Sequence, residues 1–261
     1  GEVFLVSDED WRDVLSLVPA TVWTEGADVK KYPTMIYHQE GSCVDAGPIL
    51  DFLEEFYQAS MITIVTRNPS NVPGDLLAEL NKLSYKPRIV YENPDGIIDE
   101  YWESYSDIVI VGYSNYREAL LASSYASLIN SPIIFLSSSN YNSPSNANKL
   151  TGKDAVVIGT LDAGIRSFLS SNTRSVEYLS IEQLQDRYVQ LTGTNKIILV
   201  NSLDTGFRFR DSYDFPVGAG QDATPHLDTE YSCRLFDILN KQSLASPILA
   251  ASSRPTVSDP P

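Results

Sequence analysis

The sequence predicts an α/β fold of tandem, open, mostly parallel sheets, with two complete repeats and one partial repeat. Three observations predict it. Continuous apolar runs, such as residues 108–111 and 197–200, are typical of strands buried on both faces, as in parallel sheets. Segments with apolar residues at helical spacing, such as 50–57 and 120–128, separate these runs, and this alternation indicates βαβ units. The same order of elements then recurs along the chain.

Each predicted strand is a short run rich in β-branched residues, and several begin at a proline. The runs are 3–7, 33–38, 61–66, 87–91, 107–112, 132–137, 155–159, 175–179 and 196–201. Between the first two, and between 107–112 and 132–137, lies a helix rich in Leu, Ala and Ser. Small residues such as Ala122, Ser123 and Ala126 let such a helix lie close to a sheet.

The repetition divides the chain into three parts. We place one acidic repeat at 1–105, a second at 106–195, and a partial third at 196–261 with an insertion at 203–240. The third part would leave apolar faces uncovered if it stood alone. We therefore expect it to pack against the earlier sheets and the natural chain to continue past Pro261.

Small-residue helices and the strands after them carry a family resemblance. The helices read DVLSLVPA at 13–20, EALLASSYA at 118–126 and SLASPILA at 243–250, and the second is followed by PIIFL at 132–136 and AVVIG at 155–159. In these residues the chain resembles the cell-wall-binding repeat of Gram-positive surface-layer-associated proteins. The resemblance implies open α/β repeats, packed in groups of three, that hold a protein to an anionic wall polymer.

One stretch departs from that family. Its basic Arg-x-x-Gly-x-x-Arg-Tyr segment is represented only by Arg88, Arg174 and the pair Arg187-Tyr188, which makes Arg187 and Tyr188 candidate ligand-binding residues. The first repeat has acidic residues there instead, and it holds 19 acidic residues against 7 basic ones, a net charge of −12. Such a unit is a poor partner for a polyanion.

Composition excludes several classes of protein. The chain has 261 residues, of which 43% are hydrophobic and 20% charged, so it is globular rather than disordered. Its net charge of −15 argues against nucleic acid as a partner, because such binding needs a basic face. No apolar run approaches the length of a membrane span.

The motifs of phosphate loops, dinucleotide folds, zinc proteases and serine hydrolases do not occur, so we predict no enzymatic activity and no catalytic residue. The nearest approach is Ser114 after a strand, which we interpret as a helix N-cap. A second candidate ligand site is Ser137, Ser138, Ser139 and Asn140, at the carboxyl end of a strand where α/β sheets bind ligands, although the same residues suit a simple turn.

No cofactor is expected, with one alternative. Asp211, Asp214 and Asp222 lie on a glycine-containing loop and could coordinate Ca²⁺, but their spacing does not match the twelve-residue calcium loop. Cys43 and Cys233 could form a disulfide in an exported protein, or remain two separate thiols.

Together these observations predict an extracellular, non-enzymatic cell-surface module that anchors to a cell-wall or surface polymer. Two alternatives remain open. The chain could be a structural subunit of a surface lattice that contacts other protein chains, or an α/β enzyme acting on a sugar or nucleotide.

Overall fold

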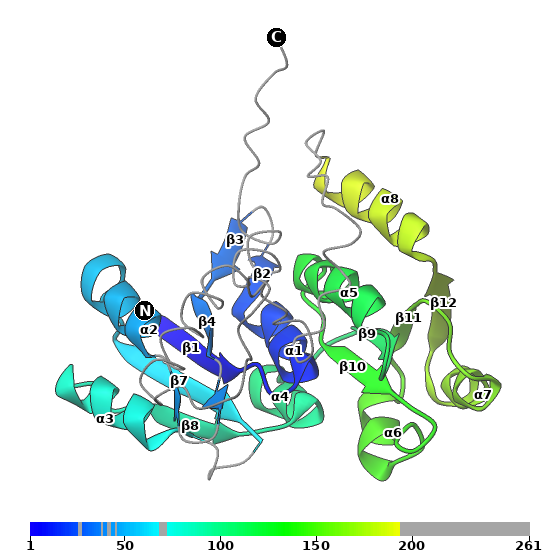
Figure 1. The fold of residues 1–261 in the computed structure, drawn as a ribbon. Coiled ribbons are helices and arrows are strands. Elements are labelled where there is room, and N and C mark those ends of the chain that lie inside the picture. The colour runs from blue at the N-terminus through cyan, green and yellow to red at the C-terminus, as the bar shows by residue number, and fades with distance from the viewer. Residues whose placement is uncertain (26–27, 38, 41–42, 45, 68–71, 194–261) are drawn as a thin grey trace, which may run out of the picture.

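The computed structural model describes residues 1–193 except 26–27, 38, 41–42, 45 and 68–71. It is an α/β protein with two separate four-stranded parallel sheets, each covered by helices (Figure 1). The predicted fold class is therefore confirmed. The predicted strand at 196–201 and the whole third part at 196–261 lie outside the described residues, so the number of repeats stays a prediction.

The two sheets have the same strand order. The first runs β4-β1-β7-β8 and the second β10-β9-β11-β12, so each has its first strand between its second and third. Strands of the first sheet are β1 (Glu2–Ser7), β4 (Thr34–Tyr37), β7 (Met61–Thr66) and β8 (Arg88–Tyr91). Strands of the second sheet are β9 (Asp107–Gly112), β10 (Ile133–Leu136), β11 (Asp154–Ile158) and β12 (Ser175–Leu179).

The register repeats as well. Glu2 opposes Met61 in the first sheet, and Asp107 opposes Asp154 in the second. The prolines expected to open strands lie one residue before them, where the carbonyl of Pro33 accepts from the Phe4 amide and that of Pro132 from the Val109 amide. A proline can occupy this place because its carbonyl, not its missing N–H, joins the ladder.

Helices cover the sheets in the same pattern in both units. The first and fourth helices share one face, and the second and third share the other. In the first unit these are α1 (Trp11–Thr21), α4 (Pro94–Tyr101), α2 (Gly47–Asp51) with the π-helical turn η1 (Phe52–Phe56), and α3 (Gly74–Lys82). In the second unit they are α5 (Tyr116–Leu128), α8 (Ile181–Thr192), α6 (Pro144–Leu150) and α7 (Ala163–Asn172).

The units meet through α1 and α5, which lie side by side between the sheets (Figure 1). Leu15 of α1 joins the core of the second unit, and the Trp11 ring meets those of Tyr116 and Phe135 edge-on at 5.2 and 5.5 Å. Ala122 and Ala126 of α5 are fully buried. Small side chains on α5 thus allow close packing at the junction.

Two short antiparallel hairpins were not predicted. One pairs β2 (Val22–Glu25) with β3 (Asp28–Lys31), and the other pairs β5 (Gln39–Glu40) with β6 (Cys43–Val44). The first is an insertion, since the second unit passes from α5 to β10 in four residues. It reaches the other unit, where Ser127 donates to the carbonyl of Val22.

One prediction at a helix start is wrong. The N-cap of α5 is Asn115 rather than Ser114, and the Asn115 side chain makes no capping bond. At the start of α1, Asp10 is the N-cap, and its carboxylate accepts from the Arg12 amide at 2.9 Å. In the described part of the chain, no helix is both long and apolar enough to cross a membrane.

Candidate binding groove

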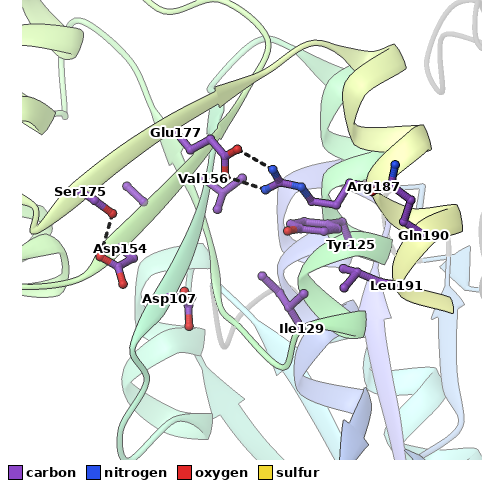
Figure 2. A pocket seen from close by; sticks show the side chains of 11 residues that line it. Asp107, Tyr125, Ile129, Asp154, Val156, Ser175, Glu177, Arg187, Gln190 and Leu191 are labelled. Atoms are coloured by element: carbon purple, nitrogen blue, oxygen red, sulfur yellow. Dashed lines mark hydrogen bonds and ion pairs between the residues drawn. The ribbon is translucent and has the colours of Figure 1, made fainter.

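A groove of about 600 Å³ lies at the amino edge of the second sheet, where β9, β11 and β12 begin (Figure 2). Its walls come from these strand starts, from the end of α5 and from the last turns of α8. Lining it are Asp107, Tyr125, Ile129, Asp154, Ala155, Val156, Ser175, Glu177, Arg187, Gln190 and Leu191.

An ion pair crosses one side of the groove. The Arg187 guanidinium on α8 binds both carboxylate oxygens of Glu177 on β12, with Nη1 2.6 Å from Oε2 (Figure 2). This bond lowers the pKa of Glu177, and the bonds to Glu177 and Tyr125 raise the pKa of Arg187. The helix is held in place by a capping box, in which Ser180 and Gln183 bond reciprocally.

A second carboxylate at the edge is also held. Asp154 accepts from Arg174 Nε at 2.8 Å and from the Ser175 hydroxyl at 2.7 Å. The hydrogen bond from Arg174 lowers the pKa of Asp154 to about 2, with Ser175 as the next cause. Asp154 therefore stays ionised throughout the physiological range.

Apolar groups lie beside these charges. Tyr125 is 4% exposed and Val156 8% exposed, whereas Leu191 at the rim is 57% exposed. The groove thus combines an apolar wall with hydrogen-bonding groups. Its lining holds three carboxylates and one guanidinium, so its own charge is negative.

The two candidate ligand sites predicted from the sequence lie on opposite edges of one sheet. Arg187 borders the groove at the amino edge, and the neighbouring Tyr188 packs against the core, where burial raises its pKa. Ser137–Asn140 follows β10 at the carboxyl edge. The structure does not bring the two sites together.

Residues 137–140 bond mainly to their own loop. Asn140 Oδ1 accepts from the Ser137 amide at 2.7 Å, and Asn140 Nδ2 donates to the carbonyl of Phe135 at 3.1 Å. The hydroxyls of Ser137 and Ser139 lie 2.8 Å apart. The Asn140 amide also donates to the carbonyl of Ser137 at 3.2 Å, so these residues form a turn that is closed by its own hydrogen bonds.

The first unit has an equivalent ion pair of reversed polarity. Arg88 on β8 pairs with Glu100, the seventh residue of α4, as Glu177 pairs with Arg187, the seventh residue of α8. A tyrosine follows the helix residue in both units. In both units an ion pair at this position therefore joins the fourth strand of the sheet to the fourth helix. The acidic residue is on the helix in the first unit and on the strand in the second.

Sequence reasoning missed most of the groove. Asp107, Tyr125, Asp154 and Glu177 were not predicted as site residues, although Asp107 and Glu177 stand on predicted strands and Asp154 lies one residue before one. The strand starts were the available signal, because parallel strands bring their first residues to one edge.

The remaining candidates are not placed. Asp211, Asp214, Asp222 and Cys233 lie outside the described residues, as does the side chain of Cys43, so the calcium site and the disulfide stay predictions. Within the described residues, no group of three or more His, Cys, Asp and Glu side chains could hold a metal ion.

No protein-family model, curated protein or solved structure matches the chain.

Proposed function

We propose that the chain is a non-enzymatic, extracellular module that anchors to a polymer of the cell surface, and that the groove is where it binds. The observation that carries this proposal is the lining of the groove. Carboxylates, an amide and a guanidinium stand beside an apolar wall. Sugars present hydroxyl groups and apolar C–H faces, which such a surface can bind together.

The charge of the groove favours an uncharged, hydroxyl-rich polymer over a polyanion. Asp107, Asp154 and Glu177 line it, and although Arg174 pairs with Asp154 and Arg187 with Glu177, three carboxylates against two guanidiniums leave one net negative charge. Phosphate or carboxylate groups on a polymer would meet like charges there. This differs from the anionic polymer that the family resemblance implies.

The test is sedimentation of the full chain with a neutral polysaccharide, with poly(glycerol phosphate) and with isolated cell walls. We expect binding to the neutral polymer and to the walls, with little loss at raised salt. Arg187→Ala should weaken it at least tenfold, because an unpaired Glu177 then faces the ligand. Since the pair is solvent-exposed, its loss should cost less than about 1 kcal/mol of stability.

Arg88→Ala is the matched control, because it removes the equivalent pair of the first unit, outside the groove. It should leave polymer binding unchanged. Equal weakening by both variants, or no binding to any polymer, would contradict the proposal. Assembly of the chain into sheets or filaments without polymer would instead support a lattice subunit.

A further inference from the structure

A network of two aspartates and two arginines lies where the first unit meets the second. β1 and β7 are neighbours in the first sheet, and their carboxyl ends bring together the start of α1 and Arg67. Asp10, Arg12 and Asp13 stand on the first turn of α1. The loop after β9 supplies Tyr113 from the second unit.

The bonds of this network run from one unit to the other. Arg67 Nε donates to both oxygens of Asp13, at 2.8 and 2.6 Å, and Arg67 Nη2 lies 2.6 Å from Asp10 Oδ2. Arg12 Nη2 donates to the same oxygen of Asp10 at 2.9 Å. Arg12 Nη1 donates to the carbonyl of Tyr113 at 3.0 Å, and the guanidinium lies 3.8 Å from the centre of the Tyr113 ring.

The two carboxylates have different roles in it. Asp10 is shared by both arginines, whereas Asp13 is bonded to Arg67 alone. Asp13 is only 9% exposed, and this burial raises its pKa to about 6 despite the hydrogen bond and charge of Arg67. Burial alone would lower the pKa of Arg67. The hydrogen bond to Asp13 and the charge of Asp13 outweigh burial, so the pKa of Arg67 is raised.

Other ionisable groups border the network. On α4, Asp95 acts on Arg67. On β4, Tyr37 is buried near Asp8 and Glu9. The remaining β4 and β10 residues are not ionisable.

On α5, Glu118 lies against Gly159, and Arg117 acts on Glu182. The charged residues of α5 thus interact with residues of their own unit. The charged groups that act most strongly on the pKa of Asp13 are Arg67, Asp10 and Arg12.

We propose that Asp13 is a protonation switch at the junction between the two units. When Asp13 is charged, the network is neutral and each arginine has a carboxylate. When Asp13 takes up a proton, Asp10 is the remaining charged carboxylate bonded to the two arginines in the described network, the network gains one positive charge, and the contact between Arg12 and Tyr113 loosens. The Arg12–Tyr113 contact is the one expected to loosen because Asp10 Oδ2 is the only oxygen in the described network that both guanidinium groups touch. A stronger pull of Arg67 on that oxygen competes with Arg12.

Protonation of Asp13 also changes the stability of the whole fold, and this effect is distinct from the rearrangement of the arginines. Because the folded state raises the pKa of Asp13, it binds this proton more tightly than the unfolded chain does. The stability contributed by the proton is complete below about pH 4 and is lost as the pH rises through about 6. Mild acid therefore stabilises the fold through Asp13 while it rearranges the arginines.

Trp11 provides a readout at the junction, since the Arg12 guanidinium lies 4.9 Å from the centre of its ring. Acrylamide quenching of tryptophan emission is measured on the full chain from pH 4.5 to 8. We expect quenching to increase on acidification with a midpoint near pH 6. Asp13→Asn should abolish this step and show the acid-state quenching at pH 7.

Two controls make the result specific. Asp154→Asn removes a partly exposed carboxylate that does not titrate in this range, and it should keep the step. His38 and His226 are retained in Asp13→Asn, so the difference between the two chains excludes them.

Carbon-13 NMR of the Asp13 carboxyl in the unaltered chain gives a second measurement that needs no folded variant. A midpoint near pH 4, or a quenching step that survives in Asp13→Asn, would overturn the proposal.

Discussion

Replacing Arg67 by alanine is expected to lower the free energy of unfolding by about 2–3 kcal/mol at pH 7. The variant leaves the buried Asp13 carboxylate without its partner. Breaking a fully buried ion pair costs about 3–5 kcal/mol, and the smaller figure applies here because the Arg67 side chain is 36% exposed. Urea denaturation at pH 7 measures the loss.

The same variant should suffer less in mild acid, where Asp13 is protonated and needs no counter-charge. Asp13→Asn in the Arg67→Ala background should recover most of the stability at pH 7, because it removes the carboxylate that was left unpaired. If the double variant is no more stable than Arg67→Ala, then Asp13 and Arg67 do not act as a pair.

Replacing Ala122 by leucine should be comparably damaging. Ala122 is fully buried on α5, within the core that also contains Leu15 of α1. Three extra carbon atoms must displace α1 or β9, and overpacking of this kind costs about 1–3 kcal/mol. Thermal and urea unfolding of the full chain measure the change.

Ser124→Leu is the control for that substitution, because Ser124 lies on the same helix but is only partly buried. It should change stability by less than about 1 kcal/mol. If the two variants are equally stable, the small residues of α5 are not needed for close packing.

The elements that depend on local pattern were predictable. The apolar runs at Met61–Thr66 and Asp107–Gly112 have the bounds that the sequence predicts, and so does the more exposed edge strand Ser175–Leu179. A buried parallel strand needs apolar residues on both faces, so its length is visible in the sequence itself. The β2–β3 hairpin was missed although it has a hairpin pattern, with β-branched and aromatic residues on both sides of Gly26.

Contacts between distant segments were not predictable from pattern. The groove joins Tyr125 to Glu177 and Asp107, and the junction joins Arg67 to Asp13 and Arg12 to Tyr113. None of these pairs has a characteristic spacing, because each depends on how helices pack over a sheet. Asp10 caps α1 through a local bond to the Arg12 amide, but its second role, holding two arginines, depends on the three-dimensional arrangement.

The β2–β3 hairpin has a consequence for biosynthesis. Val22 and Ser127, which bond to each other, are 105 positions apart, and Thr24 bonds to the carbonyl of Leu128. At ribosomal rates the hairpin emerges roughly 5–20 s before the helix that receives it. β1 precedes the hairpin, and the other three strands of the first sheet, β4, β7 and β8, are synthesised within that interval. The nascent first unit can therefore complete its sheet while its hairpin still lacks a partner. A chaperone or protease that acts during translation would therefore encounter this hairpin before the helix that it contacts has been made.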